Sequence, residues 1–288
     1  MDRQPGFLES DLVPVSAEHA RFHVIPVPYE RTTSYGKGTA LGPAAILEAS
    51  QQLEVFDGIG APGEAGIHTQ PAVDCTGAAG EVMDAIAARV GRALDMGALP
   101  VMLGGEHTVT LGAALALKAR GIEAGFVQFD AHADLRGEYE GSEYSHACVM
   151  RRVHELGFPI LQLGVRDLCR EEAQYRQNAQ GIHFFDAEDL RHGLPETPIM
   201  PAGFPELIYI TFDVDGLDAA VMPATGTPQP GGLGWYDALD LLRSVTTARR
   251  VIGMDVVELA PQPLFHGATF TAAKLTYRMM GMGSQASR

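Results

Sequence analysis

The sequence predicts an α/β protein in which short buried strands alternate with helices. Short apolar runs recur along the whole chain, and stretches with the polar and apolar pattern of a helix lie between them. This alternation is typical of parallel strands joined by helical crossovers. Two acidic clusters also stand at the ends of two apolar runs. The carboxyl ends of parallel strands are where such proteins place their functional residues.

Eight apolar runs are the expected strands. In order, they occupy residues 22–27, 67–73, 99–103, 124–130, 159–165, 182–185, 207–213 and 251–257. The clearest helix is expected at 79–96, where apolar residues recur every four positions from Val82 to Leu94. Pro43 suits the first turn of another helix. Glycines that suit the left-handed position after a helix follow three segments, at Gly121, Gly157 and Gly181.

About eight repeats fit an open parallel sheet and a closed β/α barrel equally well, and periodicity alone does not separate the two. No break in composition divides the chain, so residues 1–288 are expected to form a single domain. The stretch 222–234 is rich in proline and glycine but directly follows the second acidic cluster. It is therefore expected to be an ordered loop at the site rather than a tether between domains.

The composition argues against several classes of protein. The formal net charge of −15 disfavours nucleic-acid binding, because a phosphate backbone attracts a basic surface. No apolar run is long enough to cross a bilayer, and the acidic N-terminal stretch lacks the apolar core of a secretory signal. The three cysteines, Cys75, Cys148 and Cys169, are far apart. Together these features favour a cytoplasmic protein in a reducing compartment, without nucleic-acid or membrane partners.

The first acidic cluster, Asp130, His132 and Asp134, follows the apolar run GFVQF. The second, Asp213 and Asp215, follows LIYITF. Side chains two residues apart in a strand share a face, so the members of each cluster are expected to point the same way. Carboxylates gathered at the mouths of buried strands repel one another and lose hydration. The clusters therefore predict a bound cation, most simply a pair of metal ions.

A third strand end adds a further ligand candidate. There the run PVMLGGEHT carries two glycines that permit a sharp turn, followed by Glu106 and His107. The complete candidate set is His107, Asp130, His132, Asp134, Asp213 and Asp215. Its carboxylates and imidazoles suit a hard ion such as Mn²⁺ better than a structural zinc ion. Six ligands also suit two ions better than one.

Two further residues could take part in chemistry beside a metal pair. His146, in YSHACVMRR, could carry protons, although by itself it is more often an ordinary surface or helix-start histidine. Glu258, in DVVELAP, could accept two hydrogen bonds from a planar cation, although by itself it is more often a solvent-facing acid at a strand end. Without further context the ordinary interpretation is the default for both.

In its motifs the chain resembles the ureohydrolase family, which includes arginases and agmatinases. The resemblance covers nearly the whole chain, through VIPVPYERTTSYGKGTALGPAAILEAS, LGGEHT, FDAHADL, YSHACVMRR, ITFDVDGLD, ATGTPQPGGL and DVVELAP, in that order. It implies a three-layer αβα sandwich around an open, mostly parallel sheet of about eight strands. The resemblance thereby decides against the barrel.

The resemblance also implies the roles of the site residues. The ligands of two Mn²⁺ ions per subunit would be His107 with Asp134 for one ion, His132 with Asp215 for the other, and Asp130 with Asp213 as bridges. His146 resembles the family's catalytic histidine, and Glu258 resembles the carboxylate that holds a guanidinium group. The implied reaction is attack of a metal-bridging hydroxide on the guanidinium carbon, with Asp134 and His146 moving protons. The products would be urea and an amine.

The loop 135–145, LRGEYEGSEYS, resembles that of agmatinases and lacks the Asn- and Thr/Ser-rich pattern of arginases. Its Glu138, Glu140 and Glu143 would favour a substrate with a distal ammonium group, such as agmatine, which yields putrescine for polyamine synthesis. Each of these glutamates could equally be a solvated surface residue. Arg136 could pair with one of them or could meet a substrate carboxylate.

Agmatinase is therefore the first hypothesis, with a small cationic guanidino substrate. Hydrolysis of another guanidino or formimino compound, such as guanidinobutyrate, arginine or formiminoglutamate, is the alternative within the class. A non-enzymatic, metal-binding regulatory subunit is the alternative outside it, and the complete ligand set with His146 and Glu258 argues against it. Because relatives commonly form trimers or hexamers, the resemblance also implies a homo-oligomer.

Overall fold

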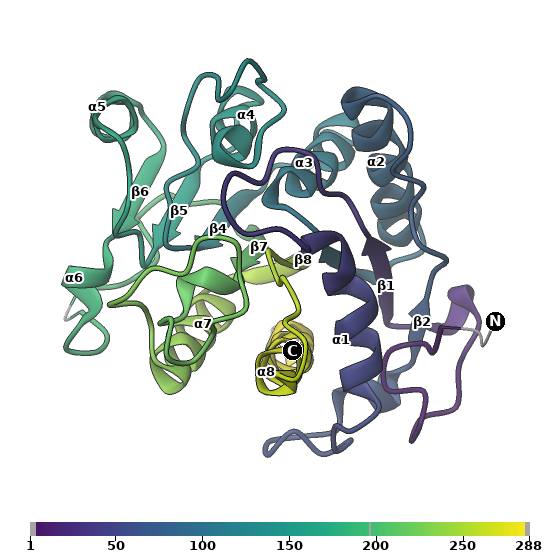
Figure 1. Cartoon of the computed structure of the whole chain (residues 1–288). Coiled ribbons are helices and arrows are strands. Elements are labelled where there is room, and N and C mark those ends of the chain that lie inside the picture. The colour runs from purple at the N-terminus through teal and green to yellow at the C-terminus, as the bar shows by residue number, and fades with distance from the viewer. Residues whose placement is uncertain (1–3, 196, 286–288) are drawn as a thin grey trace.

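In the computed structural model, eight strands form one open sheet with the order β2-β1-β3-β8-β7-β4-β5-β6 (Figure 1). The structure describes residues 4–195 and 197–285. The strands are β1 (Phe22–Val27), β2 (Ile67–Thr69), β3 (Leu99–Gly104), β4 (Gly125–Phe129), β5 (Ile160–Leu163), β6 (Ile182–Phe185), β7 (Leu207–Asp213) and β8 (Arg250–Val257). Every pairing between neighbouring strands is parallel. The predicted open sheet is confirmed, and it is parallel throughout.

Helices cover both faces of the sheet and give the predicted three layers (Figure 1). On the upper face in Figure 1 lie α2 (Ala79–Asp95), α3 (Thr110–Ala119), α4 (Val149–Glu155) and α5 (Arg170–Asn178). On the other face lie α1 (Gly42–Ser50), α6 (Ala187–Leu190), α7 (Trp235–Ala248) and α8 (His266–Gln285). The short 3-10 turns are η1 (Ala17–His19), η2 (Thr39–Leu41), η3 (Pro62–Ala65), η4 (His107–Val109), η5 (His146–Cys148) and η6 (Val214–Gly216).

Successive side chains of each strand enter two separate cores, one on each face of the sheet. In β1, Phe22 and Val24 belong to the core that includes residues of α1, α7 and α8. Ile25 and Val27 belong to the core that includes residues of α2, α3 and α4. Because strands in such a sheet are buried on both faces, they are apolar over their whole length. This is why the strands appear in the sequence as continuous apolar runs.

Each predicted strand is present, and the largest difference is at the edge of the sheet. The sequence predicts a strand over 67–73, but β2 ends at Thr69. Pro71 has no backbone N–H and interrupts the ladder, although Val73 still donates to the carbonyl of Pro26 in β1. The predicted left-handed glycines are confirmed, with φ of 61° at Gly121, 93° at Gly157 and 85° at Gly181.

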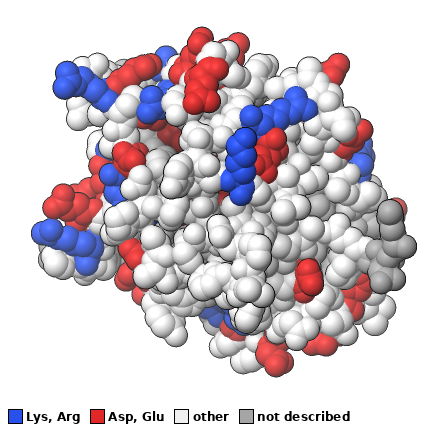
Figure 2. Space-filling view, viewed as in Figure 1, with Lys and Arg blue, Asp and Glu red and all other residues white. Residues whose placement is uncertain are grey.

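The surface carries charges of both signs. On the face shown in Figure 2, acidic side chains of the described residues form several small groups, with basic side chains among them. Within residues 4–195 and 197–285, no helix has both the length and the apolar character needed to span a membrane. The three cysteines are free thiols.

Candidate functional site

The carboxyl ends of four neighbouring strands at the centre of the sheet meet at one site. His107 begins the turn η4 after β3, and Glu258 directly follows β8. Asp213 ends β7, and Asp130 directly follows β4. The order β3-β8-β7-β4 places these four ends side by side. Residues from distant parts of the sequence therefore converge at the edge where open parallel sheets bind their ligands.

Both acidic clusters leave their strands in the same kind of turn. The backbone N–H of His132 donates to Oδ1 of Asp130 at 2.6 Å. In the same way, the backbone N–H of Asp215 donates to Oδ1 of Asp213 at 2.9 Å. The first cluster is not an extended strand, since Asp134 has a positive φ of 52°. The side chains of each cluster do converge, as predicted. They converge because hydrogen bonds from the aspartate side chains stabilise a turn, and not because of the alternation of an extended strand.

The converging side chains form two groups that share Asp130. In the first, Nδ1 of His107 lies 3.1 Å from Oδ2 of Asp130 and 2.9 Å from Oδ2 of Asp134. In the second, Nδ1 of His132 lies 3.6 Å from Oδ1 of Asp130 and 3.0 Å from Oδ2 of Asp215. The two oxygens of Asp130 thus face different groups. A carboxylate placed in this way can bridge two cations.

The sixth candidate, Asp213, stands beside the first group. Its Oδ2 lies 3.6 Å from Nδ1 of His107. Five of the six side chains are at most 6% exposed, whereas the side chain of His132 is 25% exposed. The cluster is therefore closed towards the protein interior and accessible on the side of His132.

Hydrogen bonds behind His107 determine which of its ring nitrogens carries the hydrogen. The hydroxyl of Thr211 donates to Asp255 at 2.6 Å, and that of Thr110 donates to the other oxygen of Asp255 at 2.9 Å. The oxygen of Thr211 is then left to accept a hydrogen from Nε2 of His107, 2.8 Å away. Neutral His107 consequently has its hydrogen on Nε2 and presents a bare Nδ1 to the carboxylates.

This bare nitrogen fits a bound cation. Nδ1 of His107 is buried and has no hydrogen-bond partner among the described residues, although oxygens of Asp130 and Asp134 lie within 3.1 Å. A lone pair that faces carboxylate oxygens is repelled unless a positive charge lies between them. In the described part of the chain, no Lys or Arg side chain forms an ion pair with any of the six candidates. A metal ion with imidazole and carboxylate ligands would supply the missing charge.

Burial and repulsion shift the acid–base behaviour of the cluster. Burial, together with the charges of Asp215 and Asp130, raises the pKa of Asp213 well above its usual value. Burial and the charge of Asp130 raise the pKa of Asp134 to about 7. Burial lowers the pKa of His132, but hydrogen bonds to Asp130 and Asp215 outweigh this effect and raise it to about 12. Protons thus supply positive charge when no metal is bound.

Glu258 is oriented by the first group. Its Oε1 accepts a 2.7 Å hydrogen bond from the backbone N–H of His107. Burial, followed by the charge of Glu106, raises the pKa of Glu258 well above its usual value. Glu258 and Asp134 have positive φ, at 64° and 52°, a conformation that costs a non-glycine residue about 1–2 kcal/mol. Both residues line the same pocket, and backbone strain is typical of functional positions.

One pocket collects most of these side chains. It is lined by Thr33, Ser34, Tyr35, Gly36, His132, Asp134, His146, Asp213, Asp215, Gly226, Thr227 and Glu258. His146 begins η5, and its Nδ1 lies 3.1 Å from the hydroxyl oxygen of Thr32. The structure therefore places both residues with predicted chemical roles, His146 and Glu258, around the pocket that the candidate ligands line.

The residues proposed for the far end of a substrate lie outside this pocket. Arg136 packs over the ring of Tyr139 at 4.9 Å, and its Nε is 3.8 Å from Glu172. Glu143 pairs with Arg152 at 2.8 Å. The three glutamates of the loop, Glu138, Glu140 and Glu143, are exposed. Arg136 and these glutamates are not among the residues that line the pocket.

The stretch 222–234 is an ordered loop at the site, as predicted. The guanidinium of Arg166 donates to the backbone carbonyls of Asp215 at 2.7 Å and of Gln229 at 2.8 Å. The backbone N–H of Gly36 also donates to the carbonyl of Gly226 at 3.1 Å. These bonds hold the loop against the second acidic cluster and against the segment 33–36, and all three segments line the pocket.

Sequence reasoning missed the polar residues that support the cluster. Gln128 in β4 donates a 2.7 Å hydrogen bond to Oδ2 of Asp130, and Asp255 in β8 accepts one from Thr211 in β7. Each of the three supporting residues interrupts an apolar run, in GFVQF, LIYITF and GMDVV. A buried polar side chain inside a core strand needs a partner. These interruptions are the signal that could have identified them.

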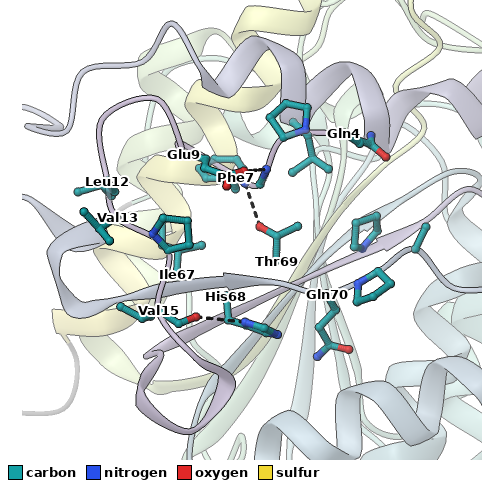
Figure 3. A pocket seen from close by; sticks show the side chains of 17 residues that line it. Gln4, Phe7, Glu9, Leu12, Val13, Val15, Ile67, His68, Thr69 and Gln70 are labelled. Carbon is teal, nitrogen blue, oxygen red and sulfur yellow. Dashed lines mark hydrogen bonds between the residues drawn. The ribbon is translucent and has the colours of Figure 1, made fainter. Parts of the chain in front are cut away.

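A larger hollow lies away from this site, between the N-terminal segment and β2 (Figure 3). Two of its polar side chains have partners within the fold. Thr69 accepts a hydrogen bond from the backbone N–H of Phe7 at 2.9 Å, and His68 contacts the carbonyl of Val15 at 3.3 Å. No cluster of candidate metal ligands in the described residues lies there. The smaller pocket at the strand ends is therefore the better candidate for chemistry.

Comparison with known proteins agrees with the fold. The model of the arginase family matches residues 20–281. The N(1)-aminopropylagmatine ureohydrolase of Synechocystis sp. is 40% identical, over 98% of this chain and 95% of the relative. The agmatinase of Pyrococcus horikoshii is 34% identical, over 96% of this chain and 97% of the relative.

Two solved structures extend the comparison. The agmatine ureohydrolase of Thermoplasma volcanium has a TM-score of 0.81 and 27% identity, covering 99% of this chain and 96% of that chain. The proclavaminate amidino hydrolase of Streptomyces clavuligerus has a TM-score of 0.85 and 23% identity, covering 99% of this chain and 98% of that chain. The second likeness concerns the fold alone.

Proposed function

The chain belongs to the arginase family and is an agmatinase-type ureohydrolase, and on this premise we propose that it hydrolyses agmatine to putrescine and urea. The proposal includes two Mn²⁺ ions per subunit at the central strand ends. The observation that carries it is that a cluster in need of cations and the buried carboxylate of Glu258 meet at one pocket. The cluster suits a metal-dependent hydrolase, and the carboxylate suits a planar guanidinium group.

The proposed ligands are His107 and Asp134 for one ion, His132 and Asp215 for the other, and Asp130 and Asp213 as bridges. Two observations support this assignment: Asp130 is shared by the two groups, and Nδ1 of His107 is buried without a partner. A mixed set of carboxylates and imidazoles suits Mn²⁺. The chemistry that such a metal pair supplies is activation of a water molecule near neutral pH.

Side chains of the protein would bind the substrate and transfer protons. Glu258 would bind the guanidinium group through two hydrogen bonds, and the bond from His107 keeps its carboxylate in one orientation. His146 would exchange protons between the pocket and solvent. Asp134, which lines the pocket beside His132, would pass a proton to the leaving amine.

The lining of the pocket favours a substrate without a carboxylate. No Lys or Arg is among the described residues that line it. Arg136, which the sequence offered as a possible partner of a substrate carboxylate, is instead placed between Tyr139 and Glu172. Arginine and guanidinobutyrate would thus bury a negative charge without a partner, which is costly. Agmatine would not.

N(1)-aminopropylagmatine is a second candidate substrate. The relatives at 40% identity carry its name, and it extends agmatine by a further amine. Tyr35 stands at the pocket and is 83% exposed, so its ring could contact that amine through a cation–π interaction. The two substrates share the guanidino chemistry and differ only at this far end.

The test is urea release with added Mn²⁺ from agmatine, N(1)-aminopropylagmatine, arginine and guanidinobutyrate. We expect kcat/KM for one of the first two compounds to exceed that for the carboxylates by about a hundredfold or more. A preference for either carboxylate would contradict the substrate assignment. Urea release by a metal-free preparation at the full rate would contradict the metal-dependent mechanism, and no urea from any compound would favour a non-enzymatic subunit.

Three broader expectations complete the proposal. We propose that residues 1–288 form one ureohydrolase domain, which is supported by the family match over 20–281. We also expect a homo-oligomer, either a trimer or a hexamer, in the cytoplasm. Sedimentation velocity measures the oligomeric state, and a monomer at all concentrations would contradict that part.

A further inference from the structure

Glu106 is a fully buried carboxylate at the central strand ends that lies outside the two ligand groups. Its Oε2 accepts hydrogen bonds from the backbone N–H groups of Arg31 at 2.5 Å and Thr32 at 2.7 Å. Its Oε1 accepts hydrogen bonds from the hydroxyls of Thr32 and Thr108, each at 2.7 Å. These four donors tie the loop after β1 to the turn that carries His107.

The hydroxyl of Thr32 joins this carboxylate to His146. Its oxygen lies 2.7 Å from Oε1 of Glu106 and 3.1 Å from Nδ1 of His146. The hydroxyl has one hydrogen to donate, and the shorter contact is to a carboxylate, which only accepts. The backbone N–H of His146 donates to the same hydroxyl oxygen at 3.0 Å. Thr32 therefore donates to Glu106 and accepts from His146.

The consequence is that Nδ1 of His146 donates its hydrogen bond. With the hydrogen of Thr32 committed to Glu106, the hydroxyl oxygen offers only lone pairs to the imidazole ring. The hydroxyl of Ser145 is 3.5 Å from Nδ1, too far to compete. Neutral His146 thus carries its hydrogen on Nδ1, and the lone pair of Nε2 is left for the pocket that this residue lines.

We propose that Thr32 and Glu106 are positioning residues, which hold His146 with its hydrogen on Nδ1 and with Nε2 available to the substrate. This inference rests on the proposed function, in which His146 exchanges protons during hydrolysis. In the other tautomer, Nε2 already holds a hydrogen and cannot accept one. Because Glu106 directly precedes His107, one strand end sets the geometry of the metal cluster and of the proton-transfer histidine.

Thr32→Val tests this proposal, because it removes the hydroxyl and keeps the size of the side chain. Thr32→Ser, which keeps the hydroxyl, is the matched control. With Mn²⁺ and the preferred substrate, we expect Thr32→Val to lower kcat about tenfold to a hundredfold and to change KM by less than about twofold. Thr32→Ser should retain most of kcat. A Ser variant as slow as the Val variant overturns the proposal.

A double-mutant cycle separates positioning from a general structural effect. In a His146→Ala background, Thr32→Val should cause no further loss of kcat, because its effect passes through the missing ring. A loss that persists in full in this background overturns the proposal. Thermal unfolding of each variant checks that the comparison is made between folded proteins.

A second measurement needs no turnover. Nitrogen NMR of the full-length protein with labelled histidine, prepared without manganese, reports which ring nitrogen carries the hydrogen, and His146→Ala identifies the signal. We expect hydrogen on Nδ1 in the wild type and a changed tautomer in Thr32→Val. Hydrogen on Nε2 in the wild type, or the same tautomer in both proteins, overturns the proposal. The tautomer can be measured even if the wild type releases no urea. A failure of the positioning proposal can therefore be distinguished from a failure of the proposed function.

Discussion

The backbone N–H of His107 donates a 2.7 Å hydrogen bond to Oε1 of Glu258, across 151 residues of sequence. The bond joins the turn after β3 to the end of the neighbouring strand β8. It places a proposed metal ligand and the proposed guanidinium-binding carboxylate in one rigid unit. Both the left-handed backbone of Glu258 and this bond fix the carboxylate before substrate arrives. Such preorganisation lowers the cost of orienting the substrate.

Glu258→Gln should therefore weaken catalysis and leave the metal content unchanged. Gln keeps an oxygen for the hydrogen bond from His107 but replaces a negative acceptor with an amide that cannot pair with a guanidinium. We expect a loss of about 3 kcal/mol in transition-state stabilisation, on the order of a hundredfold in kcat/KM. Glu48→Gln, at an exposed position of α1, is the control. An unchanged kcat/KM in Glu258→Gln would remove the residue from its role.

Asp130→Asn should remove the shared ligand of both groups. The two oxygens of Asp130 face His107 and His132, respectively, and a neutral amide bridges cations poorly. We expect the manganese content to fall. We also expect the rate of urea release to fall on the order of a thousandfold, which corresponds to a rise of several kcal/mol in the activation free energy. Elemental analysis and the urea assay measure the two effects. Asp95→Asn, whose partner Arg120 lies on the surface, should change neither, and wild-type manganese content in Asp130→Asn would refute the bridge.

The strands were predictable because burial on both faces makes them apolar without interruption. The run 207–213 appears unchanged as β7, whereas β2, at the edge of the sheet, stops at Thr69 because Pro71 breaks its ladder. The order of the strands was not predictable from periodicity. It depends on which runs pair across long crossovers, and only the family resemblance excluded the barrel.

The candidate ligands could be identified in the sequence because acids at the ends of apolar runs are unusual. The residues that support these ligands were not identified. Thr32 lies in a loop 114 residues from His146, and nothing in its local sequence indicates that contact. Gln128 and Thr211 did leave a signal, as polar residues inside apolar runs. The role of the acidic loop stayed open in the sequence, because charge alone could not tell that Glu143 pairs with Arg152.

The metal-free protein should lose stability as pH rises from about 4 to 7. Burial and Asp130 raise the pKa of folded Asp134 to about 7, whereas an unfolded aspartate titrates near 4. Between these values the folded state keeps a proton that the unfolded state releases, so rising pH favours unfolding. Burial lowers the pKa of His132, but Asp130 and Asp215 raise it to about 12. Above about pH 6.5 the folded state therefore also keeps the proton of His132 that the unfolded state releases, which again lowers stability as pH rises.

Calorimetry in the presence of a chelator at pH 5 and pH 7 measures this effect. The wild type should have the lower Tm at pH 7, and added Mn²⁺ should stabilise more at pH 7 than at pH 5, because metal replaces protons. Repulsion in this acidic chain also grows with pH, so Asp134→Asn is the control. Its Tm should depend less on pH. A wild-type Tm that rises between these pH values would contradict the prediction.

Thr211→Val should weaken metal binding without removing a ligand. The hydroxyl of Thr211 accepts the hydrogen of Nε2 of His107 and donates to Asp255, which leaves Nδ1 bare for a metal. Valine has the same shape but cannot accept, so the ring loses the bond that selects this tautomer. We expect Mn²⁺ affinity to fall about tenfold to a hundredfold, as is usual for partners behind a metal ligand.

Calorimetric titration of the chelator-treated protein with Mn²⁺ gives this affinity. Thr211→Ser should bind Mn²⁺ nearly as the wild type does, because it keeps the hydroxyl in the same strand. Urea release at saturating Mn²⁺ should recover in Thr211→Val, since the missing bond affects the occupancy of the site more than its geometry. If Thr211→Val bound Mn²⁺ as tightly as the wild type, the contact between Thr211 and His107 would serve packing alone. Another contact would then have to explain why Nδ1 of His107 carries no hydrogen.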